Sequence, residues 1–289
     1  MSLSGRKALI TGASQGLGLE IARQFVAQGA DVMLCARNHA VLDAALATLH
    51  SHAKPSQRVL GHAADIAKAE DVEALVGQTL SRLGGCDILV NNAGVYGPKG
   101  DITENDWAEW VKAIEINLFG SVLMGRALVP HFKAQRHGKI IQLSGGGATN
   151  PLPGISAYAV SKAAIVRFAE TLAEELRAFN IDVNAVAPGA LNTRMLDEVL
   201  AAGPDKVGQA FYARSQQQKQ QGGVPLSLAA GLIVFLASRA SDGITGKLIS
   251  AQWDRWQEWP DHLDALNRSD VYTLRRITGR DRGFEWGDV

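Results

Sequence analysis

The sequence predicts a single α/β domain built on a mostly parallel β-sheet. Apolar runs without alternation, KALIT at residues 7–11 and DVMLCA at residues 31–36, are typical of strands buried on both faces. Segments with apolar residues at helical spacing separate such runs along the chain. Because no linker or change of composition interrupts this alternation, we expect one domain whose parallel strands are joined by helices.

The composition indicates a globular protein without a general affinity for polyanions. Hydrophobic residues make up 46% and charged residues 20% of the chain, which is typical of a folded domain. Lys and Arg number 29, as do Asp and Glu, so the net charge is zero. A neutral chain gains no general electrostatic attraction to nucleic acid or to an anionic membrane. We therefore expect a small-molecule partner, with no nucleic acid and no membrane.

The cysteines and the N-terminus point to a cytoplasmic enzyme. Cys35 and Cys86 lie in apolar surroundings without metal-ligand spacing, so we expect reduced, buried thiols and no metal. The apolar run near the N-terminus is too short for a signal peptide or a membrane span. No stretch of eighteen apolar residues follows it.

A glycine-rich turn follows the first predicted strand. The strand over 7–11 runs into GASQGLG at residues 12–18, and a helix with apolar residues at helical spacing follows over 19–28. Glycines at this position let the backbone approach a pyrophosphate, which is stabilised by the N-terminus of the helix. The order of strand, turn and helix predicts a dinucleotide site, with an ordinary tight turn as the alternative.

The second predicted strand, over 31–36, ends in Ala36-Arg37-Asn38. In a dinucleotide-binding fold the end of this strand meets the adenosine ribose, and an acidic residue there would hold the 2′-hydroxyl. Here no acid is present, and Arg37 could pair with a 2′-phosphate instead. This predicts a preference for NADP(H) over NAD(H), while the alternative is a solvated loop arginine.

Two further strand ends carry polar residues. Strands are predicted over 57–63 and 88–90, with helices over 40–50 and 71–83. Asp65 and Ile66 follow the first of these strands, at the sheet edge where ligands gather. The second ends in NNAG at residues 91–94, which could bind a cofactor or simply make a turn.

A helix is predicted to begin at a capping-box-like pair, Thr103 and Asp106. Trp107 and Trp110 follow at helical spacing with other apolar residues, so we expect these aromatics in the core. Asn117 lies inside this helix between apolar neighbours. A buried amide must find hydrogen-bond partners, which marks this residue as unusual.

Tyr158 and Lys162 follow a predicted strand over 139–143 and a glycine-rich stretch. Their spacing of four puts both side chains on one face of a helix. A lysine ammonium beside a phenol would lower the pKa of the tyrosine from its ordinary value of about 10. Such a tyrosine could exchange a proton near neutral pH. The alternative is an ordinary helix with a tyrosine and a solvated lysine.

The remaining segments complete the sheet and add a tail. Strands are predicted over 182–187 and 247–249, and a helix over 227–238. The polar segment 214–223 is expected to be a mobile loop, within a substrate loop at about 191–223. The tail from Trp253 is rich in tryptophan, so we expect it to pack on its own subunit or on a neighbour.

Together these motifs resemble those of the classical short-chain dehydrogenases/reductases, over about residues 5–249. The resemblance implies a single-domain, Rossmann-type doubly wound sheet of about seven strands, with residues 1–252 as the catalytic domain and 253–289 as an extension. It implies catalytic roles for Asn117, Tyr158 and Lys162, and a homodimer or homotetramer. With the residues above, the expected cofactor-binding set is Gly12, Ser14, Gln15, Gly16, Leu17, Gly18, Arg37, Asp65, Ile66, Asn91, Ala93, Gly94, Tyr158, Lys162, Pro188, Gly189, Leu191 and Thr193.

Two features depart from the family pattern. Members carry a serine thirteen residues before the tyrosine, and that position is Gly145 here, with Ser144 one residue earlier. Neighbouring strand residues face opposite ways, so Ser144 could merely bond the strand end. Because Gly145–Gly147 make the backbone permissive, we predict that Ser144 fills the catalytic place, with Thr149 or a water as alternatives. The chain also continues about forty residues beyond Gly246, where the family commonly ends.

The expected function is hydride transfer between a nicotinamide and a carbonyl or alcohol carbon of a small molecule. Tyr158 would act as general acid/base, Lys162 would lower its pKa and hold the nicotinamide ribose, and Asn117 would support a proton relay. Two alternatives stay open. The chain could be a cofactor-binding protein with lost or weak turnover, because the usual serine is displaced, or a relative that modifies nucleotide sugars. The substrate is not predicted by any motif.

Overall fold

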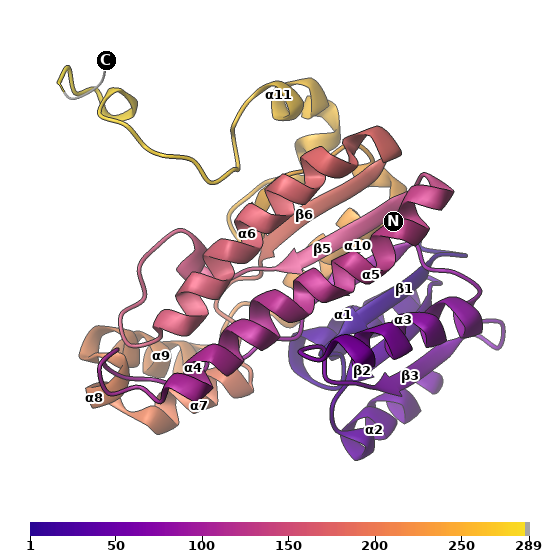
Figure 1. Ribbon diagram of the computed structural model, residues 1–289, viewed down its shortest axis with the longest axis horizontal. Helices are drawn as coiled ribbons and strands as arrows, with labels where there is room; N and C mark the ends of the chain where they lie inside the picture. The colour runs from indigo at the N-terminus through magenta and orange to yellow at the C-terminus, as the bar shows by residue number, and fades with distance from the viewer. Residues whose placement is uncertain (287–289) are drawn as a thin grey trace.

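The computed structural model describes residues 1–286 and contains a seven-stranded parallel sheet with helices on both faces (Figure 1). The strand order is β3-β2-β1-β4-β5-β6-β7. The strands are β1 (Lys7–Thr11), β2 (Asp31–Ala36), β3 (Val59–Ala63), β4 (Ile88–Asn91), β5 (Gly138–Leu143), β6 (Ile181–Ala187) and β7 (Leu248–Ser250). The predicted doubly wound, Rossmann-type fold is confirmed.

The order in which successive strands are added to the sheet reverses between β1 and β4. From β1 the chain proceeds outward to β2 and β3, and from β4 it proceeds to β5, β6 and β7 on the other side. The connections that follow β1 and β4 therefore diverge above the carboxyl ends of these strands. In open α/β sheets this divergence leaves the crevice in which ligands bind.

Helices cover the two faces of the sheet in two layers. One layer consists of α1 (Gly16–Ala27), α2 (His39–His50) and α10 (Leu226–Ala237). The other consists of α3 (Ala69–Leu83), α5 (Gly120–Gln135) and α6 (Ser156–Leu176), which lie in front in Figure 1. Successive residues of β1 enter different cores: Ile10 packs with the first layer and Leu9 with the second. Both faces being buried explains why the strand sequences show no polar alternation.

The helix that follows the fourth strand begins differently from the prediction. Its first part is α4 (Trp107–Ile114), and Asp106 caps it by accepting a 2.9 Å hydrogen bond from the Glu109 amide. Thr103 instead donates to Asp101, so the predicted capping box is wrong. Trp107 is 70% exposed and stacks on Trp110, so its predicted core position is also wrong. Helical spacing does not reveal that the first turn of α4 extends past the sheet.

A π-helical segment, Glu115–Phe119, joins α4 to α5 and carries Asn117. The run from Trp107 to Gln135 is long and apolar enough to cross a membrane by length and composition. A core helix meets the same test, and α5 supplies Met124, Leu128 and Phe132 to the core beneath the sheet. This run is therefore part of the helix layer that covers the sheet.

The predicted mobile loop is helical. After β6 the chain forms α7 (Arg194–Ala202), α8 (Pro204–Val207) and α9 (Gln209–Gln221), which we call the helical lid. Glutamine and lysine favour helices when exposed, and within α9 only Ser215 is buried. The prediction of a loop over 214–223 is wrong, because polarity reported solvent exposure and not the absence of structure. The left-handed backbone of Gly222 (φ 83°) ends α9.

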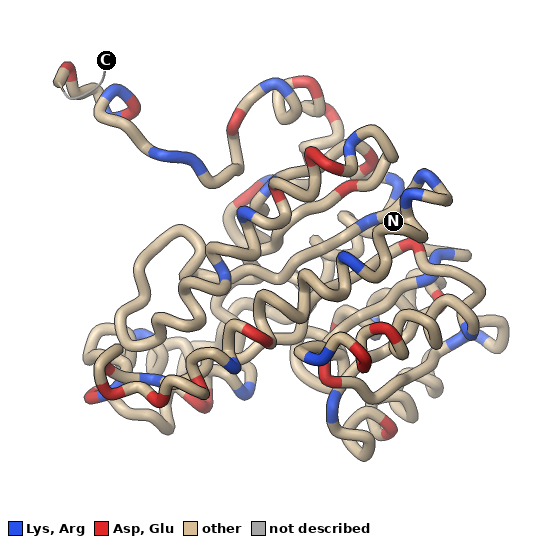
Figure 2. The backbone as a smooth tube through the Cα atoms, viewed as in Figure 1, with Lys and Arg blue, Asp and Glu red and all other residues tan. Residues whose placement is uncertain are grey.

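The C-terminal extension first packs on the domain and then leaves it. Trp256 and Trp259 are buried in the 3-10 helical segment Trp256–His262, and the Trp256 ring lies 5.2 Å from that of Phe235 in α10. After α11 (Leu263–Arg268) the chain runs beside β7, where the Leu248 amide donates to the Tyr272 carbonyl over 2.8 Å. The Leu274 amide donates to Glu170 of α6, and beyond Leu274 the chain projects away from the body (Figure 1). Positively and negatively charged residues alternate along many parts of the backbone, without a segregated patch of one sign in this view (Figure 2).

Candidate active site

A cavity of about 800 Å³ opens at the carboxyl ends of the central strands. Its wall includes Ser144 and all the predicted cofactor-binding residues except Asn91 and Gly189. Asn91 is buried and donates to the Ser121 carbonyl over 3.3 Å. Gly189 has a left-handed backbone (φ 91°) and packs beside Val224. Tertiary structure thus gathers residues from seven segments that are separated along the sequence.

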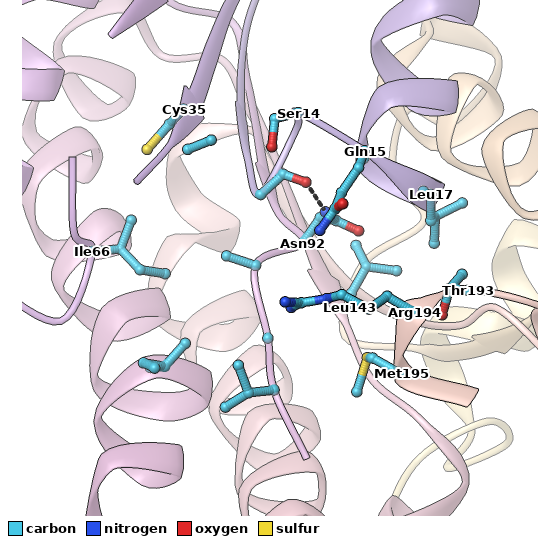
Figure 3. A pocket seen from close by; sticks show the side chains of 18 of the residues that line it. Ser14, Gln15, Leu17, Cys35, Ile66, Asn92, Leu143, Thr193, Arg194 and Met195 are labelled. Atoms are coloured by element: carbon cyan, nitrogen blue, oxygen red, sulfur yellow. Dashed lines mark hydrogen bonds between the residues drawn. The ribbon is translucent and has the colours of Figure 1, made fainter. Parts of the chain in front are cut away.

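The glycine turn between β1 and α1 is sterically constrained. Gly12 and Gly16 have positive φ values of 63° and 55°, which side-chain-bearing residues rarely adopt. A Cβ on Gly18 would overlap the Gly12 carbonyl and lie 2.5 Å from the Asn92 amide nitrogen. That nitrogen donates to the carbonyls of Thr11 and Gly12, each over 3.0 Å, and Figure 3 shows one hydrogen bond of the Asn92 side chain as a dashed line. Asn92 therefore braces the turn against the end of β4.

The N-terminus of α1 opens into this cavity. Gln15 at the N-cap makes no side-chain capping bond, and the first turn contains no acidic residue. The first N–H groups of a helix lack partners within the helix, and they combine with its dipole to attract anions. The turn and helix therefore provide donors for a phosphate group without a competing carboxylate.

The far end of the cavity lies between the ends of β2 and β3. Arg37 is exposed on its wall, and the neighbouring Asn38 side chain is occupied, since it accepts from the Val41 amide at the start of α2. Asp65 accepts from the Ala67 amide over 3.1 Å, and its other oxygen lies 4.0 Å from the Lys112 ammonium. Arg37 is thus the cation that the sequence predicted at this end, free to meet an anionic group.

Asn117 is held beside Lys162 by a closed set of hydrogen bonds. Its oxygen accepts from the Val95 amide over 2.8 Å, and its nitrogen donates to the Val95 carbonyl and to Ser161 Oγ. The Lys162 Nζ donates to the Leu143 carbonyl over 2.7 Å. A Cβ on Gly94 would lie within 3.4 Å of both side chains, so glycine leaves space for them. The Asn117 side-chain amide is therefore buried and fully hydrogen-bonded, and its bonds to Val95 fix the loop after β4.

Tyr158 and Lys162 share one face of α6, but their electrostatics differ from the prediction. Burial raises the pKa of Tyr158, and the neighbouring Tyr96 adds to that rise. Burial lowers the pKa of Lys162 to about 8. The expectation that Lys162 lowers the Tyr158 pKa is wrong in this structure, because loss of water disfavours both the phenolate and the ammonium. Lys162 Nζ lies 5.6 Å from the centre of the Tyr158 ring.

Gly145 lies directly beside the Tyr158 hydroxyl, and Ser144, which precedes it, lies on the cavity wall. Ser144 is buried on the cavity wall, and within the described residues its hydroxyl has no hydrogen-bond partner. Gly145 has an extended backbone (φ −176°), and a Cβ there would lie 3.0 Å from the Tyr158 Cζ and overlap the hydroxyl. The space that a serine side chain at residue 145 would need is therefore occupied by the Tyr158 hydroxyl. The hydroxyl of the neighbouring Ser144 has no partner among the described residues.

Two residues of the cavity wall, and Tyr96 behind Tyr158, carried no recognisable signal in the sequence. Tyr96 packs its ring edge-to-face on Tyr158 at 4.7 Å. Arg194 extends from the start of α7 into the cavity (Figure 3). Cys35 also lines the wall, where burial raises the pKa of its thiol to about 12. The sequence could have suggested Arg194 only by its position immediately after Thr193.

Comparison with known proteins identifies the family. A family model described as short chain dehydrogenase matches residues 6–203. The chain belongs to this family. Dehydrogenase/reductase SDR family member 4 of Sus scrofa is 34% identical over 247 residues, covering 86% of this chain and 86% of the relative.

Solved structures of similar sequence agree with the fold. Levodione reductase superposes with a TM-score of 0.79 at 27% identity, covering 89% of this chain and 98% of its own. The NAD+-bound xylitol dehydrogenase superposes with a TM-score of 0.78 at 26% identity, covering 86% and 98%. Family membership and these neighbours support oxidoreductase chemistry with a nicotinamide cofactor at an alcohol or carbonyl carbon.

Proposed function

We propose that this protein is an oxidoreductase that prefers NADP(H) and interconverts a carbonyl and an alcohol in a small molecule. The observation that carries the proposal is the arrangement of one continuous cavity. Tyr158, Lys162 and Ser144 line one end, the N-terminus of α1 lies along it, and Arg37 lies at the other end. An anion-binding segment between a proton-transfer group and a cation suits a phosphorylated dinucleotide.

The residues present fit a nicotinamide dinucleotide. Gly12, Gly16 and Gly18 remove the side chains that would block close approach to the backbone, and the first turn of α1 offers unpaired donors. Asp65 and Ile66 would flank the adenine, and Arg37 would pair with a 2′-phosphate. Lys162 would hold the nicotinamide ribose, with Pro188 and Thr193 beside the nicotinamide. When bound, the nicotinamide supplies or accepts the hydride.

Tyr158 is the residue proposed to move the proton. Because burial raises its pKa, the phenol stays protonated at neutral pH and can donate to the oxygen of a carbonyl substrate. In the reverse direction the phenol would first lose its proton to solvent, and the resulting phenolate would accept the proton from an alcohol. Ser144 would donate its free hydroxyl to the same oxygen, where charge develops. Asn117 would keep the loop after β4 in place and support the route for the proton near Lys162.

Substrate-dependent oxidation of NADPH tests the proposal directly. Purified protein is mixed with NADPH and with ketones, acyl thioesters, sugars and cyclic alcohols (the last with NADP+), and the cofactor absorbance is followed. We expect turnover with at least one class, and its loss in Tyr158→Phe. A protein that binds NADPH and turns over nothing in this panel would favour the cofactor-binding alternative. A protein that binds neither cofactor would contradict the proposal.

A homo-oligomer is proposed on a separate observation. Phe119, in the π-helical segment between α4 and α5, and Val160, on α6, are each 51% exposed, and Trp107 at the start of α4 is 70% exposed. Large apolar side chains on helices of one layer favour burial against a second copy. Light scattering tests this: a species of 30.8 kDa alone would contradict the proposal.

A further inference from the structure

We propose that Arg194 is a binding residue for the cofactor diphosphate, supplied by the helical lid from the side opposite the glycine turn. The inference rests on the proposed dinucleotide function and adds a residue to it. Pyrophosphates of dinucleotides sit at the N-terminus of the helix that follows the glycine turn, which is α1 here. A cation that faces this helix end from across the cavity is placed to meet the same group.

The structure puts Arg194 opposite that helix end. A Cβ on Gly16, the first residue of α1, would lie 3.7 Å from the Thr193 methyl group. Thr193 directly precedes Arg194, the first residue of α7. The Arg194 side chain extends from there into the cavity, and both residues line its wall (Figure 3).

Among the charged side chains of the described cavity wall, Arg194 is the cation available for the diphosphate. The glycine turn, residues 12–18, contains no charged side chain. Three cationic side chains line the described wall, namely Arg37, Lys162 and Arg194. Arg37 lies at the end of β2, and Lys162 is buried and donates to the Leu143 carbonyl. The diphosphate would otherwise meet backbone N–H groups and the uncharged side chains of Ser14 and Gln15.

Arg194 forms one long ion pair, which it could exchange for a contact with an anion. Its nearest carboxylate is Glu198, one turn along α7, at 3.6 Å and beyond hydrogen-bond distance. Glu198 is shared with Lys99, whose ammonium also lies at 3.6 Å. If Arg194 turned to a phosphate, Glu198 would keep Lys99 as its partner and would not be left unpaired. The arginine fork suits bidentate contact with phosphate oxygens.

Three ligands separate this role from others. NADPH and NADH both contain the diphosphate, whereas adenosine 2′-monophosphate carries the group expected at Arg37 without any diphosphate. We expect Arg194→Gln to raise the dissociation constants of NADPH and NADH by the same factor, about tenfold for one charge-assisted contact. Its dissociation constant for adenosine 2′-monophosphate should stay as in the wild type.

The control is Arg214→Gln, which removes the same charge from an exposed position on α9 of the same lid. This control should bind all three ligands as the wild type does, and Arg194→Lys should recover part of the lost affinity. Titration by calorimetry supplies the constants, and thermal melts establish that each variant is folded.

Each outcome decides something. Unchanged NADPH and NADH affinity in Arg194→Gln overturns the inference, as does an equal loss for adenosine 2′-monophosphate, which would show that the substitution disturbs the lid or the adenosine end. A loss confined to NADPH would transfer the role to the 2′-phosphate and also overturn it. Failure of the wild type to bind either dinucleotide would instead refute the proposed function itself.

Discussion

Gly145 and Tyr158 are in such close contact that a side chain added at Gly145 would displace the Tyr158 ring. A Cβ on Gly145 would lie 3.0 Å from the Tyr158 Cζ and overlap its hydroxyl. The backbone at Gly145 is extended, so the dihedral angles would accept other residues and the restriction comes from the tyrosine alone. The glycine at this position gives the hydroxyl of the proposed proton donor its present place.

The substitution Gly145→Ser should therefore displace Tyr158. We expect at least a tenfold lower kcat and a loss of about 1–3 kcal/mol in the free energy of unfolding, as for other overpacked sites. The control is Gly146→Ser, because nothing lies within 4 Å of a Cβ at that residue. Steady-state kinetics and urea unfolding supply both values. Activity equal to the wild type would show that Tyr158 has a second productive position.

Removing the Ser144 hydroxyl should affect rate without affecting stability. Its oxygen is buried and has no partner within the described residues, so Ser144→Ala breaks no hydrogen bond of the fold. Loss of one donor to a developing oxyanion lowers kcat by about 10²-fold. Ser161→Ala is the contrast, because Ser161 Oγ donates to the Tyr158 carbonyl and accepts from Asn117, and its loss should destabilise by about 1 kcal/mol. If Ser144→Ala leaves kcat unchanged, this serine has no catalytic part.

Replacing the Tyr158 phenol should abolish turnover and preserve cofactor binding. Tyr158→Phe keeps the ring that packs on Tyr96 and removes only the proton-transfer group, which accounts for about 10²- to 10⁴-fold in rate. Tyr96→Phe is the matched control, because it removes the hydroxyl of the neighbouring tyrosine, whose ring centre lies 4.7 Å from that of Tyr158. This control should change kcat by less than about threefold. Near wild-type rates in Tyr158→Phe would exclude the tyrosine from the mechanism.

Lys162 should lower stability at neutral pH. Its folded-state pKa of about 8 lies below the ordinary 10.5, so the unfolded chain binds the extra proton between these values. Stability from this group therefore rises with pH from about 8 to 10.5, and its cost is present in full below pH 8. Relative to the wild type, Lys162→Met should be most favoured near pH 7, and its relative stability should fall as the pH rises. Urea unfolding from pH 7 to pH 10 measures this difference, and a difference independent of pH would contradict the account.

Arg37 should decide between the two cofactors. Arg37→Ala is expected to raise the dissociation constant of NADPH by about tenfold or more, because a charge-assisted contact to the 2′-phosphate is lost. The dissociation constant of NADH should not change, which makes NADH the internal control. Fluorescence titration of both cofactors tests this. Tighter binding of NADH than of NADPH by the wild type would reverse the predicted preference.

Local patterns in the sequence were sufficient to predict the parallel sheet and most helices. Strands buried on both faces must be continuously apolar, as in Lys7–Thr11, and helices of the covering layers must repeat their apolar residues at helical spacing. The glycine turn, Asn117, Tyr158 and Lys162 could be singled out because their residue types and spacing have a local chemical meaning. The family they indicated is confirmed by the comparisons.

Only the tertiary structure decided which of these groups are buried, paired or in contact. Trp107 has the helical spacing of a core residue but is exposed, because burial depends on which other element packs against that position. The polar segment 209–221 is helical, because its polarity indicated only exposure to solvent. The pKa of Tyr158 is raised where proximity to Lys162 predicted a fall, since desolvation comes from the whole surrounding fold. The contact of Gly145 with Tyr158 and the approach of Arg194 to α1 join segments that lie far apart in the chain, and no local pattern encodes such distances.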